Sequence, residues 1–351
     1  MIMVKHFTKR KESEQLLFSS ISNVKKAMFL VLMASVTALT GCLKEDEPMV
    51  LPSPATGAQV FSVNIGSNYN REVYFSLKTK DSIGNEVNGW DFAFESAANG
   101  THVYINGGFG VKVSQSHYQD MNAIHDTTGC AWRYDNPSWD VDSTAIGNWQ
   151  TAAGNPVYII DRSLCSPGAP ADRFWKIKIN HANATEYSLS YARIAETTFK
   201  TVTINKTSNH TYSYFTFNND GHQLEVEPEK ENWDFVFTRY RQIFYDYSPP
   251  LVYYVNGVLL NTNLTFAAVD SITPYSSIDY NFAKTKTLSA KRDAIGYDWK
   301  LVNTATGHYI VKPYFVYIIK DHDGYYYKLH FIDFYSPTGI KGEIKFEYQR
   351  L

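Results

Sequence analysis

The sequence predicts an all-β protein, built as two tandem antiparallel β domains that follow a signal peptide. Three observations support this fold class. Aromatic residues make up 15% of the 351 residues, with 26 Tyr and 21 Phe, whereas charged residues make up only 19%. Short apolar runs are separated by turn residues, which is typical of strands. A series of sequence marks also occurs twice in the same order, which indicates an internal repeat.

The length and the charge restrict the function classes. At about 150 residues per domain, a chain of 351 residues is long enough for two domains with sizeable cores. The formal net charge of −2 provides no broad positive field that could hold a nucleic-acid backbone. We therefore expect no nucleic-acid partner, and the aromatic-rich composition excludes disorder for most of the chain.

Residues 1–41 are predicted to be a signal peptide. Lys25 and Lys26 precede an apolar run over 27–40, and the letters LTGC end at Cys42. A run of this length is too short to cross a bilayer, which takes about 20 residues, so a signal peptide is favoured over a membrane span. The letters LTGC resemble the lipobox of a bacterial lipoprotein, in which the cysteine is acylated and becomes the first mature residue. Cys42 is therefore the predicted lipidation site.

Residues 42–55 are predicted to be the lipidated cysteine and a tether. The letters KEDEP at 44–48 form a charged segment that ends in proline and cannot pack into a core. This segment resembles the lysine and acidic residues that direct lipoproteins to the cell surface in Bacteroidota, and an ordinary acidic linker that faces the periplasm is the alternative. We expect the lipid to be the only membrane contact.

Two cysteines remain in the mature chain, Cys130 and Cys165. An exported protein meets an oxidising compartment, and an even number of remaining cysteines allows one disulfide. The sequence does not show whether the two thiols lie close together. Neither cysteine belongs to a Cys-x-x-Cys motif, so redox catalysis and a thiolate metal site have little support.

The repeated marks begin early in each copy. The first copy contains the letters YFSL from Tyr74 and WDFAF from Trp90. The second copy contains YFTF from Tyr214 and WDFVF from Trp233 in the same order. Each single pair is a weak match, but a shared order of several pairs indicates a duplication.

Further marks continue this series to the end of the chain. The matched segments are, in order, AIG at 145–147 with 294–296, VYII at 157–160 with 316–319, FWKI at 174–177 with YYKL at 326–329, and YARI at 191–194 with YQRL at 348–351. The series predicts a first β domain over 56–195 and a second β domain over 200–351.

The marks themselves predict strands that are joined by hairpins. Apolar and polar residues alternate with a period of two, for example over 74–79 and 328–333. The turn sequences NDG at 219–221 and DG at 323–324 separate such runs. In Trp-Asp-Phe-x-Phe, we expect the aromatic rings to pack in the core while Asp accepts backbone N–H bonds in the preceding turn. Ala-Ile-Gly followed by Trp is typical of a turn and its anchor.

At these residues the chain resembles the HmuY family of surface lipoproteins. That family carries a Trp-Asp-x-x-Phe strand, an Ile-Gly-x-x-Trp element and a closing Tyr-x-Lys-Leu strand, which correspond here to 233–237, 295–299 and 326–329. The second copy matches best, over 201–351. The first copy matches more loosely and has a long insertion that contains Cys130.

The resemblance implies a fold of antiparallel strands and a haem-capturing role. In the founding member of the family, two histidines hold the iron, and the protein works beside a TonB-dependent outer-membrane receptor. Some relatives use methionine instead of histidine, and many have no known function. No histidine of this chain lies in a recognisable ligand motif of the family, so the ligands have to be considered residue by residue.

The first copy contains the candidate iron ligands His117, Met121 and His125. Their spacing would place them on one face of a helix, and imidazole and thioether groups are ligands of haem iron. The two histidines would be about 12 Å apart on an intact helix, too far to clamp one iron. The chain would have to fold back, or one histidine would act alone; solvated histidines in a polar insertion are the alternative.

Other chemistry has weaker support. His102 and His330 lie in strand patterns and are expected to be hydrogen-bonded residues of a sheet. The chain has no His-Glu-x-x-His and no Gly-x-Ser-x-Gly motif. The letters GGFG at 107–110 lack the spacing of a nucleotide-binding loop, and DHDG at 321–324 is expected to be a hairpin turn and not a calcium loop. We therefore expect that the protein is not an enzyme.

Together these patterns predict an outer-membrane lipoprotein, displayed at the cell surface, that binds haem or a related porphyrin for uptake. Aromatic loop residues would cover the macrocycle, and a TonB-dependent receptor would be the partner. The alternative is an interaction or structural lipoprotein without a cofactor. In that case Tyr-rich loops such as 240–254 would contact a protein or a glycan.

Overall fold

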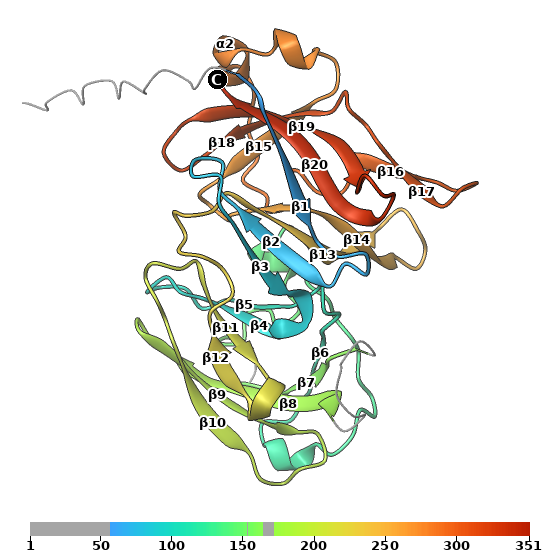
Figure 1. Cartoon of the computed structure of the whole chain (residues 1–351). Coiled ribbons are helices and arrows are strands. Elements are labelled where there is room, and N and C mark those ends of the chain that lie inside the picture. The colour runs from blue at the N-terminus through green and yellow to red at the C-terminus, as the bar shows by residue number, and fades with distance from the viewer. Residues whose placement is uncertain (1–56, 153, 164–171) are drawn as a thin grey trace, which may run out of the picture. The chain divides into compact units, whose positions relative to one another are not determined.

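The computed structural model describes residues 57–152, 154–163 and 172–351 (Figure 1). The predicted signal peptide, Cys42, the whole of the predicted tether and Cys165 lie outside these residues. Residues Ser53–Leu351 form one compact unit. Among the described residues, no helix is long and apolar enough to cross a membrane.

Strands are the main regular structure of the described chain, which confirms the all-β fold class. In chain order the strands are β1 (Gln59–Asn64), β2 (Arg71–Phe75), β3 (Ser82–Glu86), β4 (Phe92–Glu95), β5 (Val103–Ile105), β6 (Lys112–Gln115), β7 (Tyr158–Asp161), β8 (Phe174–Ala182), β9 (Glu186–Arg193), β10 (Lys200–Asn205), β11 (Tyr212–Thr216), β12 (His222–Leu224), β13 (Phe235–Phe244), β14 (Leu251–Leu260), β15 (Phe266–Asp270), β16 (Lys300–Asn303), β17 (His308–Val311), β18 (Val316–Lys320), β19 (Tyr326–Tyr335) and β20 (Lys341–Arg350).

Helical elements in the described chain are short. They are the 3-10 turns η1 (Val87–Gly89), η2 (Met121–Ala123), η3 (Val141–Ser143), η5 (Asn218–Asp220) and η6 (Tyr275–Ser277), and the α-helix α2 (Tyr280–Lys284). The predicted turn at 219–221 joins the paired strands β11 and β12, and the turn at 321–324 joins β18 and β19. Both hairpin predictions are confirmed.

The strands form four larger antiparallel sheets. Their strand orders are β1-β20-β19-β18-β15, β14-β13-β2-β3, β12-β11-β4-β5 and β10-β9-β8-β7-β6. Strands β16 and β17 form a separate two-stranded sheet. Every pair of neighbouring strands in the described chain is antiparallel, as the hairpin signals predict.

Strands from both halves of the chain meet in the same sheets. Strand β1 lies beside β20 at the other end of the chain, which Figure 1 shows as a blue strand next to a red one. Strand β10 pairs with β9, β2 pairs with β13, and β11 pairs with β4. The first strands of each half therefore belong to the sheets of the other half. The predicted boundary at 195–200 lies within the β9–β10 hairpin, and the two-domain division stays a prediction from sequence.

The repeated Trp-Asp marks explain how the halves are joined. The Asp91 carboxylate accepts a hydrogen bond from the backbone N–H of Phe217 at 2.8 Å, and the Asp234 carboxylate accepts one from Leu77 at 2.6 Å. Each donor lies just beyond a strand of the other half, so the prediction that these carboxylates accept from the preceding turn is wrong. Both aspartates are buried, and such hydrogen bonds satisfy the polar groups that the exchanged strands bring into the core.

Three clusters of buried apolar side chains hold the sheets together. One cluster joins the sheet of β20 to the sheet of β13, and a second joins the sheet of β8 to the sheet of β4. The third lies between the sheets of β13 and β4, and we call it the central aromatic cluster. Its buried members are Tyr74, Trp90, Ala93, Tyr104, Trp139, Tyr212, Tyr214, Val226, Trp233, Val236, Tyr240 and Leu259.

Candidate functional site

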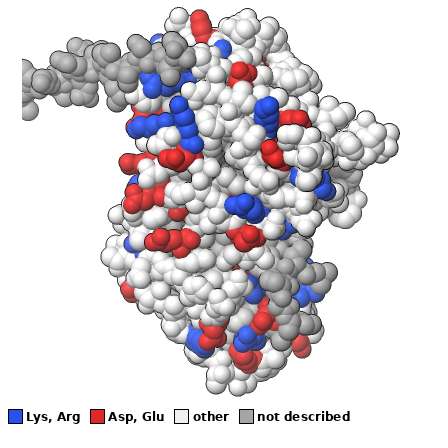
Figure 2. Space-filling model, in the orientation of Figure 1, with Lys and Arg blue, Asp and Glu red and all other residues white. Residues whose placement is uncertain are grey.

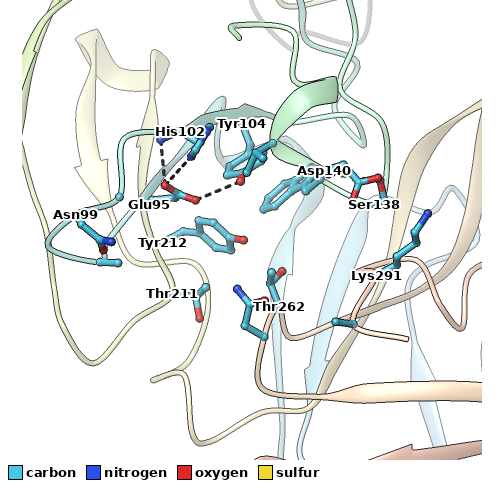
Figure 3. A pocket seen from close by; sticks show the side chains of 16 residues that line it. Glu95, Asn99, His102, Tyr104, Ser138, Asp140, Thr211, Tyr212, Thr262 and Lys291 are labelled. Atoms are coloured by element: carbon cyan, nitrogen blue, oxygen red, sulfur yellow. Dashed lines mark hydrogen bonds and ion pairs between the residues drawn. The ribbon is translucent and has the colours of Figure 1, made fainter. Parts of the chain in front are cut away.

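A pocket of about 600 Å³ opens beside the central aromatic cluster (Figure 3). Its lining comes from the ends of β4, β5 and β11 and from the loops around 138–141, 262–263 and 290–291. The volume lies within the range of about 300–1,000 Å³ that is typical of small-molecule sites. The pocket is therefore large enough for a small-molecule ligand.

His102 is the one imidazole among the residues that line this pocket. Its Nδ1 lies 3.0 Å from Oε2 of Glu95 (Figure 3). An ionised carboxylate only accepts hydrogen bonds, so Nδ1 carries the proton and the lone pair of the neutral ring resides on Nε2. No described residue forms a hydrogen bond with Nε2. The imidazole is thus oriented by one nitrogen and can act as a ligand through the other.

Glu95 occupies the last position of β4, and its carboxylate accepts several hydrogen bonds. Besides the imidazole, Oε2 accepts the backbone N–H groups of Thr101 at 2.9 Å and His102 at 3.0 Å. Oε1 accepts the hydroxyl of Tyr104 at 3.3 Å. Burial alone would raise the pKa of Glu95, but these hydrogen bonds, together with the attraction of His102, leave its pKa below the usual value. The carboxylate is therefore ionised at neutral pH.

The turn between β4 and β5 is built to bring these groups together. A Cβ on Gly100 would lie 2.6 Å from Cβ of Glu95, so only glycine permits this close approach. The hydroxyl of Tyr187 donates to the carbonyls of Glu95 and Gly100 at 2.9 and 3.0 Å. The indole Nε1 of Trp149 donates to the carbonyl of Thr101 at 2.8 Å. The Trp of the Ala-Ile-Gly mark therefore anchors the backbone beside His102, in agreement with its predicted role.

Aromatic rings form one wall of the pocket. The Trp139 ring stacks on Tyr104 with centroids 4.5 Å apart and meets Tyr212 edge-on at 5.0 Å. The guanidinium of Arg292 lies 3.7 Å from the centroid of Trp139, which is a close cation–π contact. Burial raises the pKa of the Tyr104 and Tyr212 phenols well above the usual value, so both remain protonated.

The backbone of Trp139 is strained, because its φ of 53° lies in the left-handed region. A bulky residue in this region costs of order 1–3 kcal/mol, and such outliers concentrate at functional sites. The strain places the indole between Tyr104 and Tyr212. At the mouth of the pocket, the charged side chains of Asp140 and Lys291 are exposed.

The three sequence-predicted ligands have different surroundings. His117 and His125 are exposed, whereas Met121 is only 3% exposed and packs with Ile124 and Val157 in an apolar cluster. The segment contains one 3-10 turn at its centre and no α-helix, so the shared helical face does not form. Their role as ligands stays a prediction. Within the described parts of the chain, no three His, Cys, Asp or Glu side chains form a group suited to a metal ion.

Cys130 and His330 do not line this pocket. Cys130 is half-buried, and its predicted disulfide partner Cys165 lies outside the described residues, so this bond stays a prediction. His330 is hydrogen-bonded through Nε2 to Glu347 at 2.7 Å and stacks on Tyr275, as expected for a residue of a sheet. His102, which was expected to have the same structural role, is likewise hydrogen-bonded, through Nδ1 to Glu95, but it also lines the pocket.

Sequence reasoning missed His102 because its strand pattern resembles that of any sheet residue. The informative signal is a carboxylate at Glu95 followed by the small residues 97–100 before His102. That spacing allows a tight turn to fold the carboxylate back onto the imidazole. The aromatic walls have no local signal, because Trp139 and Tyr212 come from distant segments.

Comparison with known proteins gives a family but little further detail. The sequence matches the model of the family described as HmuY protein over residues 68–348. None of the curated proteins matches the chain. Apo PinO from Porphyromonas gingivitis is 10% identical, with 85% of this chain and 98% of that chain covered and a TM-score of 0.32.

Two further solved structures are similar at the same level. The apo HmuY analog of Tannerella forsythia is 9% identical, with 86% of this chain and 98% of that chain covered and a TM-score of 0.25. A structure from Bacteroides vulgatus described as an HmuY-like heme binding protein is 12% identical, with 83% of this chain and 90% of that chain covered and a TM-score of 0.17. The family match extends over most of the chain and includes both Trp-Asp marks and the pocket residues from Glu95 to Lys291. The chain therefore belongs to the HmuY family.

Proposed function

We propose that this protein binds haem or a related iron porphyrin in the pocket beside the central aromatic cluster, with His102 as an iron ligand. The observation that carries the proposal is the hydrogen bond between Glu95 and His102. This bond keeps the proton of the His102 ring on Nδ1 and leaves the lone pair of Nε2 free. Membership of the HmuY family supports the proposal.

The residues of the pocket fit an iron porphyrin in two respects. A neutral imidazole supplies the nitrogen ligand that haem iron accepts. The buried rings of Tyr104, Trp139 and Tyr212 pack on one another and on Arg292, so they support the pocket from behind and do not stack on the macrocycle. The ammonium group of Lys291 at the mouth offers a positive charge to carboxylate substituents on the edge of the macrocycle.

A non-enzymatic role in uptake is the setting that we propose for this binding. The LTGC letters would anchor the protein by a lipid on Cys42, and the KEDEP segment would favour display at the surface of the outer membrane. A TonB-dependent receptor would take the porphyrin from the pocket. The exposed mouth with Asp140 and Lys291 would allow such a transfer.

His117, Met121 and His125 are the alternative ligands. Both histidines are exposed and would be free to bind a porphyrin at the surface. Among the described residues, no hydrogen bond holds either ring, whereas Nδ1 of His102 is held by Glu95 at 3.0 Å. Met121 would have to leave its apolar cluster to reach iron. The geometry therefore favours His102.

A haemin titration of the mature polypeptide 44–351 tests the proposal. We expect a saturable shift of the Soret band with the original sequence and its loss with His102→Ala. The matched controls are His117→Ala and His125→Ala, which should retain the shift. A featureless, non-saturable absorbance like that of free haemin would contradict haem binding, and a loss confined to His117→Ala or His125→Ala would place the ligand in the other segment.

A second function is favoured by the exposed end of the β13–β14 hairpin. Tyr245, Tyr247 and Tyr253 are 67%, 55% and 61% exposed, and Leu251 is 42% exposed. Exposed tyrosines give large contact area at low entropic cost, so this tip suits contact with a protein or a glycan. Replacement of the three tyrosines by serine should then remove partner binding and leave haemin binding unchanged. Retained partner binding would contradict this second function.

A further inference from the structure

We infer that Glu95 is a positioning residue that makes the pocket select iron porphyrins over metal-free porphyrins of the same shape. The inference rests on the proposed function, because it concerns the ligand of the same pocket. Glu95 would act through His102 and would not touch the porphyrin. A carboxylate on Nδ1–H fixes the ring tautomer and raises the basicity of Nε2, which strengthens a bond to iron but does nothing for a macrocycle without metal.

The first argument is the geometry of the carboxylate. Oε2 accepts three N–H groups within 3.0 Å, from the His102 ring, the His102 backbone and the Thr101 backbone. The backbone bonds fix the carboxylate relative to the chain, and the ring bond then fixes the imidazole relative to the carboxylate. Glu95 is 23% exposed and His102 is 30% exposed, so the pair is partly shielded from water and its attraction is stronger than that of a fully exposed pair.

The second argument is the rigidity of the turn. Lys206 Nζ donates to the carbonyl of Gly100 at 2.6 Å, in addition to the bond from Tyr187. The Trp149 indole holds the next carbonyl, at Thr101. The backbone around Glu95 and His102 is thus fastened by side chains from three other segments. Such fixed support is what a ligand needs to keep its orientation while the iron is absent.

The third argument comes from the other His–carboxylate pairs of the described chain. His330 contacts Glu347 through Nε2 at 2.7 Å, but its Nδ1 lies 3.2 Å from the Pro313 carbonyl, so both nitrogens are engaged. His181 lies 3.6 Å from Glu186 and is 56% exposed, so this pair is loose.

His322 completes this set of pairs. Its Nε2 lies 3.4 Å from Asp323, and its Nδ1 is buried without a hydrogen-bond partner among the described residues. A buried nitrogen is not open to a porphyrin. Among the described residues, the Glu95–His102 pair alone combines a held nitrogen, a free nitrogen and a place in the lining of the pocket.

The test compares haemin with metal-free protoporphyrin IX on the mature polypeptide 44–351. Glu95→Gln retains an oxygen acceptor but removes the negative charge. We expect this variant to bind haemin about 10- to 100-fold more weakly, the usual effect of losing such a partner, and to bind protoporphyrin IX as the original sequence does. The reduction potential of the haemin complex should rise, because a less basic imidazole stabilises ferric iron less.

Two further variants make the outcomes distinguishable. Glu347→Gln is the matched control, because it removes the charge from a His–carboxylate pair outside the pocket and should change neither ligand's affinity. His102→Ala should weaken haemin but not protoporphyrin IX. If His102→Ala leaves haemin binding unchanged, the proposed function itself is wrong.

The outcomes that overturn the inference concern Glu95 alone. Equal weakening of haemin and protoporphyrin IX in Glu95→Gln would show that Glu95 only maintains the shape of the pocket. An unchanged haemin affinity and an unchanged reduction potential, with His102→Ala still defective, would show that the imidazole acts without its carboxylate. Circular dichroism of each variant verifies that the comparison is made on folded protein.

Discussion

Two regions in the same half of the chain contain candidate iron ligands. The turn between β4 and β5 contains His102, and the segment after β6 contains His117, Met121 and His125. The side chains of the two regions have different surroundings. In the turn, one carboxylate and three anchoring side chains fix a single imidazole at the edge of a pocket. In the segment, two imidazoles point to exposed surroundings and the thioether packs in a core. A suitable spacing of ligand types is therefore less informative than a group that holds one ligand atom in place.

The physical cause of this difference is the local backbone. Strands β4 and β5 are paired, so the turn between them has fixed ends. Residues 117–125 follow the end of β6 and contain only one 3-10 turn. Ligands on fixed elements keep their geometry with less loss of conformational entropy on binding. The predictions below test this contrast, from the largest expected effect to the smallest.

The largest effect is expected from His102→Ala. Loss of the carboxylate in Glu95→Gln is expected to weaken haemin binding about 10- to 100-fold. Loss of the iron ligand itself in His102→Ala should weaken haemin binding by more than that. Absorbance titration measures the affinity, and the spectrum should resemble that of free haemin. Retention of the original Soret band in this variant would remove the distinction between the two regions.

Met121→Ala should cause a large loss of stability without loss of binding. Met121 is 3% exposed in an apolar cluster, and truncation of such a side chain costs about 2–5 kcal/mol in the free energy of unfolding. Denaturant unfolding measures this cost, and haemin titration at a temperature where the variant is folded measures binding. A lost Soret shift in folded protein would instead support Met121 as a ligand.

Gly100→Ala should weaken both the turn and the site. An added Cβ would lie 2.6 Å from Cβ of Glu95, so the turn must shift, at a cost of about 1–3 kcal/mol. Haemin affinity should also fall, because the displaced carboxylate of Glu95 would no longer hold the His102 ring in place. Gly89→Ala is the matched control, because nothing lies within 4 Å of a Cβ at that position. Equal effects of the two substitutions would contradict the tight approach at Gly100.

The pH dependence of stability should reveal the Glu95 carboxylate. Burial raises the pKa of Glu95, but the hydrogen bonds from the backbone and ring of His102 lower it by more. The pKa of Glu95 therefore lies below the usual 4.5. A carboxyl group with a lowered pKa stabilises the fold above its unfolded-state pKa, and this contribution is lost as the pH falls through the folded-state pKa. The difference in unfolding free energy between the original sequence and Glu95→Gln should therefore shrink below about pH 4.5. A difference that grows on acidification would contradict this sign.

The smallest effect is expected from the double substitution His117→Ala and His125→Ala. Both side chains are exposed, so their removal should leave stability within about 0.5 kcal/mol of the original value. Haemin affinity should also stay unchanged. A large loss of haemin affinity in this variant would reverse the assignment and support the sequence-predicted ligands.

The sequence was sufficient for the fold class but not for the pairing of its strands. Alternating runs and turn letters identify strands and hairpins, including the turns at 219–221 and 323–324. They do not identify the partner of β1, because both halves carry the same marks and β20 lies at the other end of the chain. The carboxylate of Asp91 illustrates this limit, because its donor Phe217 belongs to the other half.

Only an anchoring residue of the site, Trp149, could be predicted from the sequence. The Trp149 mark was interpreted as a turn anchor, and the indole does hold the carbonyl of Thr101. The bond between Glu95 and His102 depends on a turn that glycine permits, and the aromatic wall depends on Trp139 with its positive φ. The aromatic wall arises from tertiary packing of distant segments and has no period or spacing in the sequence, whereas the Glu95–His102 pair has only the local signal of the small residues 97–100 between them.

The most direct measurement of the central claim is the position of iron in a haemin complex, located by anomalous diffraction from crystals of the polypeptide 44–351. We predict one iron within coordination distance of Nε2 of His102. Iron bound at His117 or His125, or the absence of a bound iron after saturation with haemin, would contradict the account.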